Sequence, residues 1–355
     1  MNELLTIAQS YLDSEVAPRA NVIDHDPGAL RAALDGLCSR NLMALRRPEE
    51  FGGPALSERE FRQFQTMVAA VSGSLAFLQT QHQSAVSLIS RSSNADLKDR
   101  YLPYMADGQK LVGIGFSQLR RKGPPLLKAQ QVNGGYVLDG SVPWVTGLTF
   151  YHEFLIGATL PDGESLFGLV PFHDTENMKL GHVMKLSAME SPQTVSAAVS
   201  GLFLPDSQVV NTRPAGWIHT NDLINIILQG FFAIGCAQGG LDVLRKAADH
   251  KGDPCIKEAH EALSQEVTQC QAAMEAAQDK SNEDQTTDEK LRVRAWAIDL
   301  ASRCAHAAVA ATGGSANSVE NDAQRLYREA LVYTVSAQTQ PIMKATLERL
   351  SKLHT

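Results

Sequence analysis

The sequence predicts an α+β fold in which an N-terminal helical domain, a middle antiparallel β domain and a C-terminal four-helix bundle follow one another. Three observations support this order. Apolar residues recur at three- and four-residue spacing up to about residue 108, short segments of alternating or continuous apolar residues follow up to about residue 212, and the helical spacing returns after Pro214. We therefore place the three domains at 1–108, 109–212 and 213–355.

The N-terminal domain is predicted to be helical because its apolar residues repeat with the period of an α-helix. Four segments carry this pattern: "MNELLTIAQSYL", "GALRAALDGLCSRNLM", "SEREFRQFQTMVAAVSGSLAFLQTQHQSAVSLIS" and "NADLKDRYLPYMADG". Ser57 precedes Glu60 as in a capping box, and Asn94 precedes Leu97 at the start of a further helix.

The middle domain is predicted to be a barrel-like or sandwiched antiparallel sheet. Its apolar segments are short, as strands are. Turn signals separate them, at Asn133-Gly134-Gly135, Asp139-Gly140 and Pro161-Asp162-Gly163.

Four long helices are expected after Pro214, at about 218–250, 255–278, 288–312 and 319–352. Gly313 and Gly314 mark the break between the last two helices. The segment 224–241 comes closest to a membrane span, but its Asn, Gln and Gly residues favour a buried helix.

Composition and charge exclude several classes of function. The 355-residue chain has 32 basic and 39 acidic residues, a net charge of −7, and no long basic run, so we expect no nucleic-acid partner. Its five cysteines are scattered without a CxxC pair, and its start lacks the pattern of a signal peptide. We therefore expect free thiols and a cytoplasmic location. No His, Cys or carboxylate pair has metal-ligand spacing, so we expect no metal site.

Several local strings, in this order along the chain, resemble the acyl-CoA dehydrogenase family. They are "LMALRRPEEFGG" (42–53), "LKDRYLPYMADGQKLVGIGFSQ" (97–118), "VNGGYVLDGSVPWVTG" (132–147) and "AIDLASRCAHAAVAATGGSA" followed by "QRLYREALVYTV". Members of that family are FAD-dependent oxidoreductases with the same domain order, and they dehydrogenate acyl thioesters at the CH–CH group. The resemblance therefore implies FAD as cofactor, an acyl thioester or related small molecule as substrate, and a homodimer or homotetramer.

The resemblance places the flavin ring against "PWVTG" (143–147). Trp144 and Thr146 occupy positions whose family counterparts lie beside the isoalloxazine, where the threonine hydroxyl bonds flavin N5. Ser117 stands where the family has a threonine that faces the flavin pyrimidine. Without the resemblance, Trp144 and Thr146 would form an ordinary strand end and Ser117 would be an ordinary strand residue.

This sequence keeps only some of the residues that contact the FAD phosphates in the family. Gly313 and Gly314 match the Gly-Gly of the family's "Q-x-x-G-G" turn beside the pyrophosphate, although they would equally serve as an ordinary helix break. The Gln of that motif is Ala310 here. The family's "E-R-x-Q-F-G", whose Arg reaches the FAD phosphates of a neighbouring subunit, has no counterpart.

Three basic residues replace the family's Gly-rich substrate loop. Arg120, Arg121 and Lys122, in "RRKGPP", either attract the phosphates of CoA or of a phosphopantetheine carrier, or form a solvated charge cluster. His82 lies on a helix that leads toward the family's substrate cavity. It is either a substrate contact or a core residue bonded to backbone.

The family's catalytic base is missing from the expected position. In most members a Glu in "Y-E-G-T" removes the substrate's α-proton while a hydride leaves the β-carbon for the flavin. Aligning residues 328–339 on that motif puts Ala337 on the Glu, and puts Thr339 on the Thr, which we count among the cofactor contacts. A minority of members carry the Glu on the first bundle helix, where this chain has Ile224 or Asn225.

Three functions therefore remain open. The first is a flavin-dependent oxidoreductase of this family with an unusual substrate or base. The second is a flavin-dependent monooxygenase on the same fold, which takes reduced flavin and oxygen and needs no such base. The third is a catalytically inactive member of the family.

Overall fold

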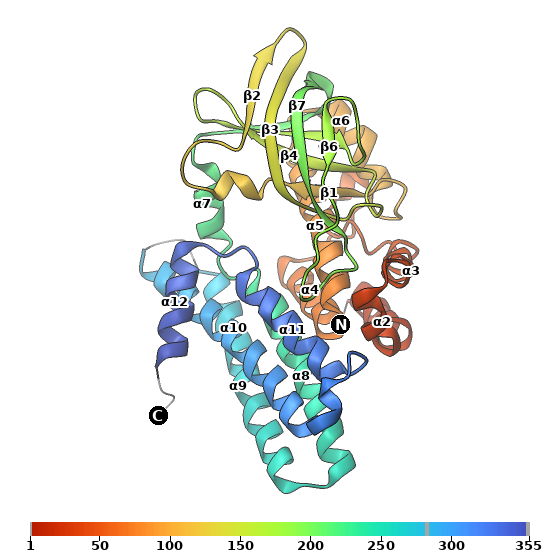
Figure 1. Cartoon of the computed structure of the whole chain (residues 1–355), viewed down its shortest axis with the longest axis vertical. Coiled ribbons are helices and arrows are strands. Elements are labelled where there is room, and N and C mark those ends of the chain that lie inside the picture. Colours follow the sequence, from red (N-terminus) through yellow and green to blue (C-terminus); the bar gives the residue numbers. More distant parts are fainter. Residues whose placement is uncertain (1, 281–283, 353–355) are drawn as a thin grey trace.

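The computed structural model describes residues 2–280 and 284–352. Figure 1 shows the β sheet at one end of the long axis and the helical bundle at the other, with the N-terminal helices beside the junction between them. The predicted order of helices, sheet and bundle is confirmed. No helix within the described ranges is long and apolar enough to cross a membrane.

The N-terminal helices are α1 (Glu3–Tyr11), α2 (Ala20–His25), α3 (Pro27–Cys38), α4 (Glu58–Val71), α5 (Gly73–Ser90) and α6 (Ala95–Tyr101). Both predicted caps are present. The Ser57 hydroxyl accepts from the Glu60 N–H, and the Glu60 carboxylate accepts from the Ser57 N–H at 2.9 Å. Asn94 caps α6 in the same way.

The predicted helical segment 57–90 is two helices, because the backbone breaks at Ser72. This residue has an extended conformation, and its hydroxyl accepts the Leu75 N–H at the start of α5. The break turns α5 relative to α4 and lets α5 pack against both the sheet and the bundle.

The middle region forms one sheet of eight strands in the order β6-β7-β3-β2-β4-β5-β8, with β1 paired to β4. The strands are β1 (Val112–Gly115), β2 (Leu127–Val132), β3 (Gly135–Thr146), β4 (Glu153–Thr159), β5 (Ser165–Pro171), β6 (Met178–Leu180), β7 (Thr194–Pro205) and β8 (Val209–Arg213). Most strand pairs are antiparallel, as predicted. The sheet is nevertheless mixed, because β4 pairs in parallel with both β1 and β2.

The sheet curls, so that strands that are not hydrogen-bonded neighbours pack against each other. A Cβ on Gly168 of β5 would lie 2.4 Å from a methyl carbon of Leu204 on β7. Only glycine therefore permits this close approach of β5 to β7.

The C-terminal helices are α7 (Trp217–Ile224), α8 (Gly230–Lys251), α9 (Pro254–Gln278), α10 (Asp284–Thr312), α11 (Asp322–Val335) and α12 (Gln340–Ser351). Helices α8 to α11 pack as the predicted four-helix bundle, and α12 packs on α10. The predicted helix 218–250 is interrupted by a turn at 225–229, so α7 lies apart from the bundle, next to the sheet (Figure 1).

The predicted helix 319–352 is also interrupted, and this correction matters for the site. Helix α11 ends at Val335, Ala337 has a positive φ of 46°, and α12 begins at Gln340. Pro341 lacks the N–H that a continuous helix would need, which is the local reason for the break.

Helix α8 contains residues 230–241 of the apolar segment 224–241, and most of these residues are buried, as predicted. Ile224, at the end of α7, is exposed. Two of its glycines face α4. A Cβ on Gly235 would lie 2.4 Å from the Thr66 carbonyl oxygen, and a Cβ on Gly239 would lie 2.5 Å from that of Ala70. These glycines set the close contact between α4 and the bundle.

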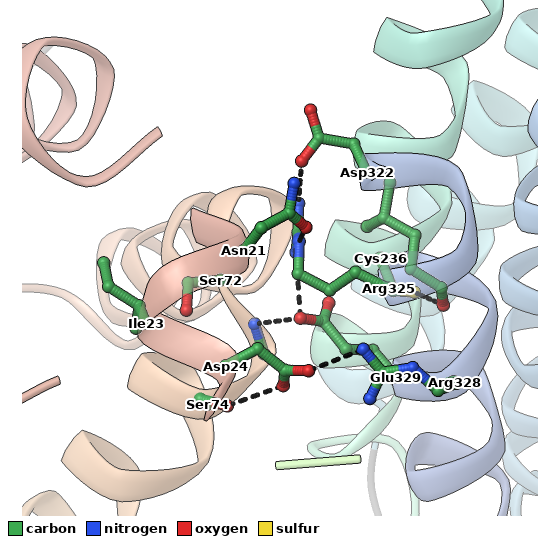
Figure 2. A network of polar contacts seen from close by, with 12 residues as sticks. Asn21, Ile23, Asp24, Ser72, Ser74, Cys236, Asp322, Arg325, Arg328 and Glu329 are labelled. Carbon is green, nitrogen blue, oxygen red and sulfur yellow. Dashed lines mark hydrogen bonds and ion pairs between the residues drawn. The ribbon is translucent and has the colours of Figure 1, made fainter. Parts of the chain in front are cut away.

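A buried carboxylate on α2, Asp24, ties the N-terminal helices to the bundle and to the loop after β6 (Figure 2). It accepts from the Ser74 hydroxyl at 3.0 Å and from the Met189 N–H at 3.2 Å, and it pairs with Arg328 at 2.7 Å. Every oxygen of this carboxylate therefore has a donor.

A second buried carboxylate, Glu329 on α11, lies beside the first (Figure 2). It pairs with Arg325 at 2.8 Å and accepts the first N–H of α5, from Gly73, at 3.0 Å. Arg325 also donates to Asn21 and to Asp322. Burial raises the pKa of Glu329, although Arg325 opposes this shift.

Candidate active site

The end of β3 presents an aromatic ring and a hydroxyl where the sequence predicts a flavin contact. The register between β3 and β7 shifts between Val142 and Val145, which breaks the alternation of the strand. As a result Trp144 is 48% exposed, whereas Val145 and Thr146 are both buried. The Thr146 hydroxyl lies 3.0 Å from that of Thr194 on β7, which leaves it capacity for further hydrogen bonds.

Ser117 begins a short 3-10 helix, η5 (Ser117–Arg120), and is exposed. It was predicted as a strand residue or a flavin contact. The strand alternative is wrong, because β1 ends at Gly115. The η5 turn packs against both β3 and α7.

Arg120 does not present a free charge for a substrate phosphate. Its Nε and Nη2 atoms donate to the two oxygens of Asp222, each at 2.8 Å, and Asp222 is largely buried. This bidentate pair links the β domain to α7. The substrate-phosphate prediction for Arg120 is thus not supported, because the guanidinium already has a matched partner.

The two following cations behave differently. Arg121 is exposed, and its side chain makes no hydrogen bond or ion pair within the described residues. The Lys122 ammonium lies 3.2 Å from the Gln340 side-chain oxygen at the start of α12. The loop 120–122 thus reaches both α7 and α12. Of its three cations only Arg120 is paired with a carboxylate within the described residues, and Arg121 has no hydrogen-bond partner there.

The turn between α11 and α12 contains the position predicted to correspond to the family's Glu. Ala337 is exposed in this turn. Thr339 is the N-cap of α12, where its hydroxyl accepts the Ile342 N–H at 3.5 Å. No residue from Ser336 to Thr339 carries a carboxylate.

A buried arginine on α10 is hydrogen-bonded to the backbone of this turn. Arg294 on α10 is completely buried and donates from Nη2 to the Ser336 carbonyl at 3.1 Å. Its Nε and Nη1 atoms have no partner within the described residues. Burial lowers the pKa of Arg294 to about 9. A Cβ on Gly230 would lie 3.6 Å from its Cδ, so Arg294 also adjoins the start of α8.

The Gly313-Gly314 turn lies at the opposite end of the bundle from this turn. The Lys251 ammonium at the end of α8 donates to the Ala311 carbonyl at 2.5 Å, whereas the start of α8 adjoins Arg294. The 22 residues of α8 span about 33 Å at 1.5 Å per residue. One copy of the chain therefore does not bring Gly314 to the end of β3.

No atom within the described residues lies within 4 Å of a Cβ placed on Gly313 or on Gly314. Gly313 has a φ of 78°, which favours glycine. Gly314 has no such backbone reason, so nothing inside the described chain requires a glycine there. The open surface fits a group that approaches the backbone from outside.

A small cavity of about 80 Å³ lies between α4, α5 and the start of α8. Its wall includes three aromatic side chains, Phe61, Phe231 and Phe232, together with polar and charged ones, among them Thr80 and Ser84 of α5, Arg46 and Arg62. Sequence reasoning did not find this cavity, because its wall combines three segments that are far apart in the chain.

Comparison with known proteins gives the family. The model named "Acyl-CoA dehydrogenase, N-terminal domain" matches residues 2–109, and the model named "Acyl-CoA dehydrogenase, C-terminal domain" matches residues 227–350. The chain belongs to the acyl-CoA dehydrogenase family. The family resemblance inferred from the local strings is confirmed.

Curated relatives span most of the chain at low identity. Benzylmalonyl-CoA dehydrogenase of Aromatoleum aromaticum is 25% identical over 278 residues, which cover 75% of this chain and 73% of the relative. The short-chain specific acyl-CoA dehydrogenase of Mus musculus is 21% identical and covers 96% and 87%. Among solved structures, butyryl-CoA dehydrogenase from Megasphaera elsdenii has a TM-score of 0.81 at 17% identity, with 99% of both chains covered. The structural likeness confirms the fold.

The residues predicted to occupy the family's two base positions are Ala337 and either Ile224 or Asn225, and none of them carries a carboxylate. Ile224 ends α7, and the Asn225 side chain donates to the Asn221 carbonyl. The nearest acid on that helix, Asp222, is held by Arg120.

His82 lies on α5 in the core, and its ring has no atom free for a substrate. Its Nδ1 accepts the Val112 N–H at 2.9 Å, so the proton is on Nε2, which donates to the Met105 carbonyl at 2.9 Å. The ring is completely buried. The core alternative of the sequence prediction thus fits, and a substrate contact by His82 is not supported.

Acid is expected to destabilise the fold through His82. Burial lowers the pKa of His82 from 6.5 to about 4. His82 therefore takes up a proton below about pH 6.5 in the unfolded chain but only near pH 4 in the native chain. The free energy of unfolding falls as the pH drops through this window. At 1.36 kcal/mol per unit the loss reaches about 3 kcal/mol. Urea unfolding across this pH range should show this slope.

His82→Gln keeps a donor and an acceptor without the titration, so its unfolding free energy should change less with pH than that of the wild type. His173→Gln, at an exposed position, is the matched control and should keep the wild-type profile. Equal slopes in the wild type and His82→Gln would contradict the assignment.

Proposed function

We propose that the chain is an FAD-dependent oxidoreductase that acts on an acyl thioester or related small molecule at the CH–CH group without the family's usual catalytic Glu. The observation that carries this proposal is the end of β3. The half-exposed ring of Trp144 and the Thr146 hydroxyl there offer a stacking surface and a hydrogen bond to a flat, polar-edged cofactor. Bound FAD supplies a hydride acceptor for such a reaction.

Ser117, Arg121 and the cavity between α4, α5 and α8 are the groups with which this chain would bind cofactor and substrate. Ser117 offers an exposed hydroxyl beside β3, and Arg121 offers an unpaired cation that suits a phosphate of CoA. The aromatic side of the cavity between α4, α5 and α8 suits a short acyl group. Its volume of about 80 Å³ favours a small acyl group over a long chain.

The α-proton of an acyl thioester needs a base, and the α11–α12 turn supplies none. It offers two hydroxyls, from Ser336 and Thr339, and one amide, from Gln338, none of which accepts a proton at neutral pH. Removal of a positioned base typically slows such a step by about two to four orders of magnitude. Slow dehydrogenation is therefore part of the proposal.

The separation of the two predicted cofactor regions supports a homodimer or homotetramer. Trp144 lies in the sheet and Gly314 lies at the far end of the helical bundle of the same folded chain. A cofactor that touches both therefore has to lie between two copies of the chain. Exposed apolar residues recur at four-residue spacing along α11, at Tyr327, Leu331 and Val335. Such a stripe is suited to burial against a second copy.

A flavin-dependent monooxygenase is the second candidate, and the turn without a carboxylate favours it, because that chemistry needs no base for an α-proton. Anaerobic addition of short-chain acyl-CoA thioesters to the purified, flavin-loaded protein separates the two. Loss of the flavin absorbance supports the dehydrogenase. Oxygen consumption by the pre-reduced protein, without bleaching by any thioester, supports the monooxygenase. A protein that binds no FAD is the inactive member of the family.

Thr146→Val is expected to weaken FAD binding about tenfold, because it removes one hydrogen bond to the cofactor and keeps the shape of the side chain. Fluorescence titration of the apoprotein with FAD measures the change. Thr194→Val is the matched control, since it removes the same Thr–Thr contact but leaves the Thr146 hydroxyl. Equal weakening in both variants would show that Thr146 acts only through Thr194.

A further inference from the structure

A cavity of about 230 Å³ lies apart from the end of β3, between the loop that follows α3 and the C-terminal half of α5. Three arginines line it: Arg46 and Arg47 from the loop, and Arg91 at the end of α5. Ser87 and Ser90 add two hydroxyls from the same helix. Neither the family assignment nor the proposed function uses this cavity.

The three cations are only partly neutralised. Arg46 pairs with Glu58 and stacks on the Phe61 ring at 4.2 Å. Arg47 donates to backbone carbonyls, among them that of Gly52 at 2.6 Å. Arg91 is exposed, and its side chain makes no hydrogen bond or ion pair within the part of the chain that the structure describes.

The charge of the lining is therefore net positive. Two carboxylates, Glu49 and Glu58, face three guanidinium groups. Burial lowers the pKa of Arg46, and Arg91 and Arg62 lower it further, while Glu58 raises it. Of the three guanidinium groups, that of Arg91 is the exposed one. An exposed guanidinium without a partner in a concave site is a usual arrangement for binding an oxyanion.

The position on α5 limits what such an anion is attached to. Thr80, Ser84, Ser87 and Arg91 follow one another at helical spacing, so they share one face of α5. The first two line the smaller aromatic cavity and the last two line the larger one, and Arg46 lines both. The two cavities thus meet at Arg46, along one polar stripe of the helix.

We propose that Arg46, Arg47 and Arg91 form a binding site for the carboxylate or phosphate group of a small anionic ligand. The cavity volume accommodates such a group with a short stem, but not a nucleotide-sized molecule. Arg91 supplies the free charge, Arg46 shares its charge between Glu58 and the ligand, and the serine hydroxyls complete the donor set.

Isothermal titration calorimetry of the full chain with inorganic phosphate and with succinate, at constant ionic strength against a chloride blank, tests the site. We expect saturable binding of at least one anion. Binding of phosphate alone identifies a phosphoryl group, and binding of succinate alone identifies a carboxylate. Absence of saturable binding of both anions at millimolar concentration overturns the proposal.

Two substitutions of opposite sign make the test specific. Arg91→Gln should weaken binding about tenfold or more, because it removes a charge-assisted bond from a residue with no structural partner. Glu58→Gln should tighten binding, because it releases Arg46. Arg292→Gln removes an exposed arginine on α10 and should leave binding unchanged. Equal loss in Arg91→Gln and Arg292→Gln would show unspecific charge attraction instead. The inference does not rest on the proposed function, since neither flavin nor thioester takes part.

Discussion

Replacing Arg325 with methionine is expected to destabilise the protein by about 3–5 kcal/mol, because it leaves the fully buried carboxylate of Glu329 without its cation. The remaining donor, the Gly73 N–H, cannot offset the cost of burying a charge. Urea unfolding at neutral pH measures the loss. Arg245→Met is the matched control, since its pairs with Asp242 and Asp249 are exposed, and it should cost less than about 1 kcal/mol.

A second substitution separates the charge from the packing. Arg325→Met combined with Glu329→Gln removes both charges and keeps an acceptor for Gly73, so it should recover most of the lost stability. The single variant should also lose less at low pH, because burial already raises the pKa of Glu329 and a protonated side chain needs no cation. A single variant as unstable as the double variant, at all pH values, would contradict the role of the charge.

The sequence pattern predicted the order of the elements and their caps, because these depend on neighbouring residues. Ser57 and Glu60 form the predicted capping box from two positions three residues apart. The break at Ser336 was missed for a related reason. The apolar period continues across it, and Pro341 is the one local residue that indicates the start of a new helix.

The arrangement of the candidate site could not be predicted, because it depends on contacts between residues that lie far apart in the sequence. Arg120 and Asp222 are 102 residues apart, so the sequence alone cannot show that the charge of Arg120 is already paired. Arg325 and Glu329 have the spacing of an ordinary surface pair on a helix. They are buried because α2 and α8 pack on α11 and the start of α5 reaches Glu329 through the Gly73 N–H (Figure 2). The order of the elements and the local caps were thus predictable from the sequence, whereas the ion-pair partner of each charged residue was not.

Ala337→Glu is expected to raise the rate of flavin reduction by a short-chain acyl-CoA by about two to four orders of magnitude, because it places a carboxylate at the position aligned with the family's base. The turn is a firm support for such a side chain. Arg294 holds the Ser336 carbonyl from below, and Thr339 caps α12 on the other side. Ala337 is exposed, so the longer side chain meets no packed neighbour. Anaerobic stopped-flow absorbance measures the rate.

The left-handed conformation of Ala337 helps to decide which residue of the turn occupies the position of the family's catalytic base. The family motif "Y-E-G-T" has a glycine directly after the base, and glycine favours a positive φ such as the 46° of Ala337. If Ala337 corresponds to that glycine, the base position is Ser336, and Ser336→Glu should be the faster variant. Ala337→Gln and Ser336→Gln, which match in size and lack a base, should keep the wild-type rate. No gain from either Glu over its Gln control would place the proton acceptor elsewhere and would count against a dehydrogenase site at this turn.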